Sequence, residues 1–104
     1  MIQKNNNFEI LDKIYSIIND RKKNRKKNSY TYTLMKRGNK QIAQKVMEES
    51  SELIIDFLKG SKKRTIEEAA DLIFHLLILL NKKNILPKDL AKELKSRYKK
   101  WWAM

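Results

Sequence analysis

Residues 69–80 read AADLIFHLLILL, and in this almost wholly apolar segment only Asp71 and His75 are polar. The two side chains are four residues apart, so they lie on one face of a helix, and Glu68 continues that face one turn earlier. A helix that is apolar on nearly every side is predicted to be buried on most sides. A carboxylate on such a helix needs a charged partner or a metal ion, because an unpaired buried charge is costly.

The N-terminal end of this helix bears on how Glu68 is interpreted. Ser61 or Thr65 can cap the helix, and Thr65 forms the capping-box pattern T-x-x-E with Glu68. No lysine or arginine lies between positions 65 and 81, so this segment offers no local cation for Asp71. Glu68 is therefore either part of a helix cap or a ligand.

A second long helix is predicted just before this segment, over residues 39–59, with Asn39 as its N-cap and Gly60 as its C-cap. A tight turn at Gly60 makes the two long helices antiparallel neighbours. Glu49 lies beside the apolar stripe of the earlier helix and borders the core, whereas Lys45 lies along its edge. The stripe itself, which is expected to face the core, consists of Ile42, Val46, Leu53 and Phe57.

The acidic residues are concentrated on these two helices. The chain has 12 acidic residues and a net charge of +12, yet seven of the acids fall within one short region: Glu48, Glu49, Glu52, Asp56, Glu67, Glu68 and Asp71. Two carboxylates ~6 Å apart repel by roughly 3 kcal/mol at an effective dielectric constant of ~20. A divalent cation relieves such repulsion, and we interpret four of the carboxylates as its ligands: Glu49, Glu52, Glu68 and Asp71. All-oxygen ligation is typical of Mg²⁺ or Mn²⁺ rather than zinc, and carboxylate-held Mg²⁺ usually acts on phosphate groups.

Simpler interpretations stand beside this one. Glu48 can pair with Lys45 or lie in solvent, and His75 is expected to be a core histidine bonded to Asp71, with direct participation in the site as the alternative. Ordinary surface charges are expected at Asp56 and Glu67.

The rest of the chain is also predicted to be helical. Residues 9–21 have apolar side chains at helical spacing, which predicts a helix. The basic run RKKNRKKN at residues 21–28 is predicted to be an exposed linker. A short apolar stretch after Ser29 stops at Gly38, and Pro87 opens a final helix that extends to about residue 100. The predicted fold is all-α, with four to five helices.

The expected organisation is a single domain, in which an N-terminal helix and basic linker at residues 1–28 precede a helical core at residues 29–104. The absence of cysteine and the single histidine exclude a cysteine-ligated metal, a thiol nucleophile and a multi-histidine site. The longest apolar run, residues 76–80, is far shorter than the ~20 residues of a membrane span. We therefore expect a soluble, cytoplasmic protein with no membrane partner.

The acidic motifs resemble those of a known superfamily. The pattern E-x-x-E at Glu49 and Glu52, followed after fifteen residues by E-x-x-D at Glu68 and Asp71, is similar to that of the all-α nucleoside-triphosphate pyrophosphohydrolases, which include the MazG-like enzymes. Within it, the chain resembles the phosphoribosyl-ATP pyrophosphohydrolase family of histidine biosynthesis. The segments that carry this likeness are Ser29-Tyr30-Thr31, the stretch 34–38, QIAQKVMEESSEL, EAADLIFHLLILL and a closing helix at 89–97.

The resemblance implies a MazG-like fold and hydrolysis of phosphoribosyl-ATP, a small nucleotide, to phosphoribosyl-AMP and pyrophosphate. Mg²⁺, with Mn²⁺ as a substitute, would be held by the four ligands named above. It further implies catalytic roles for Glu48, as the residue that orients or deprotonates water, and for Glu49. The expected substrate-binding residues are Ser29, Tyr30, Arg37 and Lys45. A homodimer is also expected, because so short a chain has too few helices to cover residues 69–80 on every side.

Two rival functions are weighed against this one. A MazG-like enzyme acting on other nucleoside triphosphates would use the same chemistry. A basic helical nucleic-acid-binding module would explain the pI of about 10.0 and the run at residues 21–28. An acidic cluster on buried helices has no use in such a module, so nucleic-acid contact is expected to be nonspecific at most.

Overall fold

The computed structural model describes residues 7–102, and all regular structure in that range is helical. This confirms the predicted all-α class. Five helices follow one another along the chain: α1 (Glu9–Lys23), α2 (Tyr30–Arg37), α3 (Asn39–Lys59), α4 (Lys62–Asn81) and α5 (Pro87–Trp102). None of these helices combines the length and the apolar character needed to cross a membrane.

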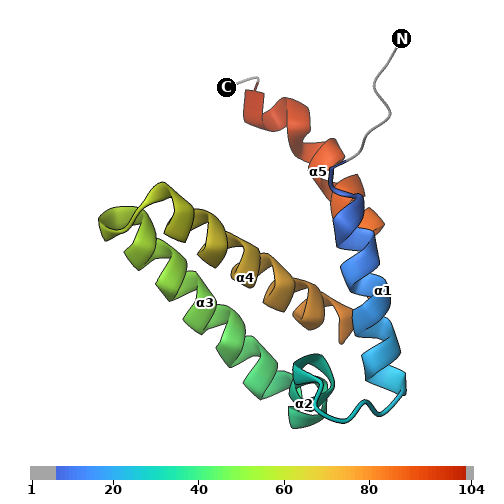
Figure 1. The fold of residues 1–104 in the computed structure, drawn as a ribbon. Coiled ribbons are helices and arrows are strands. Elements are labelled where there is room, and N and C mark those ends of the chain that lie inside the picture. The colour runs from blue at the N-terminus through green and yellow to red at the C-terminus, as the bar shows by residue number, and fades with distance from the viewer. Residues whose placement is uncertain (1–6, 103–104) are drawn as a thin grey trace.

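Helices α3 and α4 form an antiparallel hairpin, the central pair that the sequence predicts (Figure 1). The Gly60 N–H donates to the carbonyl of Asp56 at 2.8 Å and closes the end of α3. Ser61 caps α4, since its hydroxyl accepts from the Arg64 N–H at 3.1 Å. The prediction of a capping box that starts at Thr65 was wrong. Thr65 lies inside α4, and its hydroxyl donates to the Ser61 carbonyl at 2.9 Å.

Helix α3 begins differently from the prediction. Its N-cap is Gly38, with no side-chain cap, and Asn39 is the first helical residue. Gly38 has φ +97° and ψ 173°, a conformation that only glycine adopts easily. The chain therefore passes from α2 to α3 without an intervening loop.

The hydrophobic core lies at the end of the hairpin that is remote from Gly60. There α1 and α2 pack against the start of α3 and the end of α4 (Figure 1). The buried apolar side chains are Tyr15, Ile18, Leu34, Met35, Ile42, Leu77 and Ile78. Helix α5 contacts α1 and contributes no buried residue.

The predicted burial holds for only half of each long helix. Ile42 is fully buried, but Phe57, at the other end of the predicted core stripe, is 68% exposed. On α4, Leu77 and Ile78 are buried whereas Ile73 is exposed. The expectation of a core-facing stripe that reaches Phe57 was wrong because, in the part of the chain that the structure describes, no other helix covers the Gly60 end of the hairpin.

Candidate metal centre

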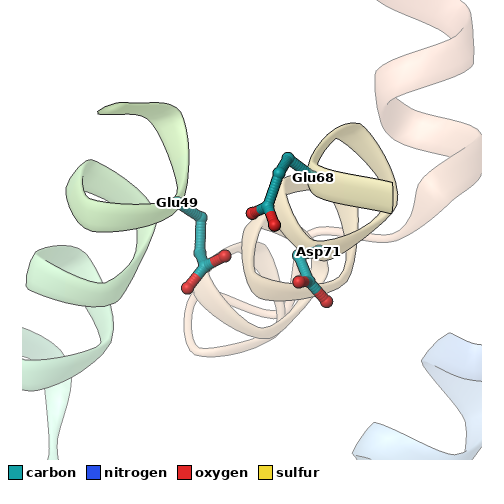
Figure 2. Close-up of side chains that lie close together, drawn as sticks. All are labelled: Glu49, Glu68 and Asp71. Atoms are coloured by element: carbon teal, nitrogen blue, oxygen red, sulfur yellow. The ribbon is translucent and has the colours of Figure 1, made fainter. Parts of the chain in front are cut away.

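Three carboxylates meet between the two long helices, and they come from three of the four predicted ligands. Glu49 projects from α3 toward α4, whose residues Glu68 and Asp71 face it from the other side (Figure 2). One carboxylate oxygen from each residue lies within 4.8 Å of those of the other two. This spacing follows from the antiparallel hairpin, which puts the middle of α3 opposite the first half of α4.

The environment of the cluster is suited to a cation. Glu49 and Glu68 are each only 5% exposed, whereas Asp71 is exposed, so the cluster is buried on one side and open on the other. Oε1 of Glu68 is buried and has no hydrogen-bond partner among residues 7–102. A buried carboxylate oxygen left without a donor is costly unless a cation binds it. The all-oxygen donor set fits a hard divalent cation such as Mg²⁺ or Mn²⁺.

The electrostatics of Glu68 also favour a bound cation at the cluster. Burial raises the pKa of Glu68 above its ordinary value, and the negative charges of Glu52 and Asp71 raise it further, against the opposing effect of Arg64. Glu52 is exposed and outside the group of three, but its charge acts on Glu68. The ionised form of Glu68 is therefore disfavoured in the empty site, an effect that a bound cation would offset.

Lys45 lies at the α3 side of the cluster. Its Nζ is 3.2 Å from Oε2 of Glu49 and 3.7 Å from Oε1 of Glu48. Burial lowers the pKa of Lys45, but the bond to Glu49 and the nearby negative charges outweigh this effect, so the pKa is raised overall. Glu48 is exposed and is not one of the three clustered carboxylates.

Arg64 lies at the α4 side, and the sequence analysis overlooked it. Its Nη2 is 2.9 Å from Oε2 of Glu68 and 3.4 Å from Oδ2 of Asp56, and its Nη1 is 2.8 Å from Oε1 of Glu67. Arg64 lies one residue before Thr65, just outside the segment that was predicted to offer no local cation. The four-residue spacing between Arg64 and Glu68 was the available signal, because residues so spaced are neighbours on a helix.

A hydrogen-bonded chain joins α2 to α4 next to the cluster. His75 is buried, and its Nδ1 donates to the main-chain carbonyl of Asp71 at 2.7 Å. In a neutral ring Nε2 is then an acceptor, and the Tyr30 hydroxyl donates to it at 2.7 Å. The predicted bond between His75 and Asp71 therefore exists, but it uses the main-chain carbonyl of Asp71 and not its carboxylate.

The remaining candidate residues lie at the two ends of α2. Ser29 is the N-cap of α2, and its hydroxyl accepts from the Tyr32 N–H at 3.1 Å. Tyr30 is the first residue of the helix and its ring contacts Phe74 and His75. Arg37 is the last residue of α2 and is exposed.

Comparison with known proteins identifies one family and several similar proteins that bear the name of the same enzyme. The family described as phosphoribosyl-ATP pyrophosphohydrolase matches residues 11–98. Proteins named phosphoribosyl-ATP pyrophosphatase are similar over most of their length. The relative from Sulfolobus acidocaldarius is 53% identical over 91 residues, which cover 88% of this chain and 96% of the relative. Those from Sulfurisphaera tokodaii and Saccharolobus islandicus are 46% and 44% identical, over 86% and 88% of this chain and 96% and 97% of the relatives.

Proposed function

This chain belongs to the phosphoribosyl-ATP pyrophosphohydrolase family, and from that premise we propose how its carboxylate cluster serves the reaction. The enzyme hydrolyses phosphoribosyl-ATP to phosphoribosyl-AMP and pyrophosphate in histidine biosynthesis. In this reaction one water molecule is added across the anhydride between the α- and β-phosphates, which separates phosphoribosyl-AMP from pyrophosphate. Such a reaction needs positive charge around the triphosphate and an oriented water.

The observation that carries the proposal is the group formed by Glu49, Glu68 and Asp71, in which Oε1 of Glu68 is buried and has no hydrogen-bond partner among the described residues. We propose that these three residues hold Mg²⁺, with Glu52 close enough to serve as a fourth carboxylate. The ion, when bound, would neutralise phosphate charge and lower the pKa of water. The exposed side of the cluster, at Asp71, is where the triphosphate would approach.

The other candidate residues would act on the substrate and on the attacking water. Lys45 already contacts two carboxylates of α3, and its ammonium group is in reach of a phosphate oxygen bound at the cluster. We propose that Glu48, on the exposed face beside Lys45, orients the water and accepts its proton. The remaining substrate contacts are proposed for Ser29, Tyr30 and Arg37 at the ends of α2.

We also propose that the enzyme acts as a homodimer. The Gly60 end of the hairpin exposes large apolar side chains that no helix of the described chain covers, namely Ile54, Ile55, Phe57, Leu58 and Ile66. Large apolar side chains exposed together at one end of a hairpin favour a protein interface. A second copy of the chain would bury it.

The decisive experiment measures pyrophosphate release from phosphoribosyl-ATP and from a panel of nucleoside triphosphates, with Mg²⁺ and with EDTA. We expect Mg²⁺-dependent release from phosphoribosyl-ATP in the wild type. Asp71→Asn should lower kcat/KM by at least about 100-fold, because it removes a charged ligand. Asp12→Asn on α1, an exposed position away from the cluster, is the matched control and should retain activity. Release only from the common triphosphates would instead support an enzyme of the MazG-like type.

A further inference from the structure

The two buried glutamates of the cluster are held in the same way. Each has a cation four residues earlier on its own helix: Lys45 for Glu49 at 3.2 Å, and Arg64 for Glu68 at 2.9 Å. In both pairs the cation contacts one of the two carboxylate oxygens. For Glu68, the other oxygen, Oε1, is buried and forms no hydrogen bond within the described part of the chain.

We propose that Arg64 is a positioning residue for the metal centre. Its guanidinium binds Oε2 of Glu68, so that Oε1 is presented to the space shared with Glu49 and Asp71. This inference rests on the proposed function of the cluster. Arg64 would not itself touch the cation or the reacting phosphate. It would act by fixing one rotamer of a ligand.

The geometry explains why an arginine suits this task. The side chain of Arg64 is 54% exposed, and its guanidinium spans carboxylates on both helices, Asp56 on α3 and Glu67 with Glu68 on α4. A planar group with several donors can hold these contacts together, whereas a lysine ammonium is a compact charge without that fork. Arg64 thus joins the end of α3 to the start of α4 across the Gly60 turn.

The need for such a residue follows from the charges around Glu68. Glu49 and Asp71 lie beside Glu68 in the cluster and carry the same negative charge, whereas Arg64 contacts Glu68 with a positive charge. Without Arg64, repulsion from these two neighbours would favour rotamers that carry the Glu68 carboxylate away from the cluster. Residues that orient a metal ligand typically change metal affinity by about 10 to 100-fold when they are removed.

A competing role for Arg64 predicts the opposite change in metal affinity when the residue is removed. A guanidinium 2.9 Å from Glu68 could act as a substitute cation that the metal must displace, and its removal would then tighten metal binding. The free Oε1 argues for positioning instead, because the metal and Arg64 can use different oxygens of the same carboxylate.

The test uses direct Mn²⁺ binding, followed by electron paramagnetic resonance without substrate, together with the Mg²⁺ dependence of pyrophosphate release. Arg64→Ala should weaken Mn²⁺ binding by about 10 to 100-fold and raise the Mg²⁺ concentration for half-maximal rate by a similar factor. The maximal rate at saturating Mg²⁺ should stay within a few-fold of the wild type, since no group that touches substrate is lost. Arg64→Lys should restore part of the affinity.

Arg97 provides the matched control. It is exposed to a similar extent on α5 and pairs with Glu93 at the same four-residue spacing, at 2.7 Å. Arg97→Ala should leave Mn²⁺ binding unchanged. The inference would be overturned if Arg64→Ala bound Mn²⁺ as tightly as the wild type or more tightly. If the alanine variant does not fold, the same result for Arg64→Lys would overturn it. Either result would leave the proposed function unaffected. A wild-type protein that binds no Mn²⁺ would instead overturn the metal site itself.

Discussion

Glu68 is subject to two opposing requirements. As a ligand it must be ionised, yet in the metal-free protein its burial and the charges of Glu52 and Asp71 raise its pKa. A raised pKa in the folded state means that the folded protein binds this proton more tightly than the unfolded chain does. The site therefore reduces the stability of the protein whenever it is ionised and empty, and metal binding removes that cost.

This argument predicts a pH dependence of stability. In EDTA, the contribution of Glu68 to the free energy of unfolding should be most favourable at acidic pH. It should be lost as the pH rises from the ordinary value of 4.5 through the raised pKa of the folded state. Urea denaturation across this range should show the decline in the wild type, with a smaller decline in Glu68→Gln. The same variant should lose the rise in Tm that Mg²⁺ produces in the wild type. Identical pH profiles would contradict the assignment.

Glu48 and Glu49 are adjacent in sequence but differ in burial, which predicts different effects of the same substitution. Glu49→Gln should abolish both Mg²⁺ binding and turnover, because Glu49 is part of the buried cluster. Glu48→Gln should retain Mg²⁺ binding within a few-fold and lower kcat by about 100-fold, as expected for loss of a general base. Calorimetric Mg²⁺ titration and single-turnover kinetics measure the two effects separately. If Glu48→Gln leaves kcat unchanged, the water-orienting residue must be sought elsewhere.

At the scale of elements, the junction between α2 and α3 depends on Gly38. Its φ of +97° and ψ of 173° are strained for any residue with a Cβ, although open space surrounds the position where that atom would lie. We expect Gly38→Ala to destabilise the protein by about 1 to 3 kcal/mol, through backbone strain and not through a steric clash. Urea denaturation measures this loss.

The control for Gly38 is another position with positive φ. Asn28 has φ 65°, a left-handed conformation that asparagine tolerates, so Asn28→Gly should change stability by less than about 1 kcal/mol. Because α2 carries Tyr30 and Arg37, Gly38→Ala should also raise the KM for phosphoribosyl-ATP. A Gly38→Ala variant as stable as the wild type would show that the junction relaxes without cost.

At the scale of the whole molecule, the core and the carboxylate cluster lie in different parts of the hairpin. The core occupies the end where α1 and α2 pack, and the opposite end exposes Phe57 and Leu58, which are 68% and 70% exposed. Figure 1 shows this end extending beyond the other helices. An interface with a second chain at this end would support the two helices that carry the ligands.

The proposed homodimer is tested by sedimentation. The wild type should sediment as a dimer at micromolar concentration, and Phe57→Asp should weaken the association by at least about 100-fold, since a charge buried in an apolar interface is costly. Ile17→Asp, at an exposed apolar position on α1, is the control and should remain dimeric. A wild type that is monomeric at all concentrations would exclude the proposed assembly.

Local patterns in the sequence were enough to predict most of the architecture. Apolar spacing gave the two long helices, and glycine and serine placed the turn between them, because these signals act between residues close in the chain. The acidic spacing gave Glu49, Glu68 and Asp71 as candidates, since an antiparallel hairpin brings its two acidic motifs face to face. These predictions need no knowledge of how distant segments pack.

The tertiary structure decided what surrounds those residues. Phe57 follows the same helical stripe as the buried Ile42, but burial depends on whether another helix packs there, and none in the described chain does. Arg64 contacts Asp56 on the facing helix, which requires the turn at Gly60 to bring the two together. The sequence by itself thus determined the helices and the candidate ligands, through short-range periodicity. Only the folded structure decided which oxygen of Glu68 is left free, because that depends on charges brought together from two helices.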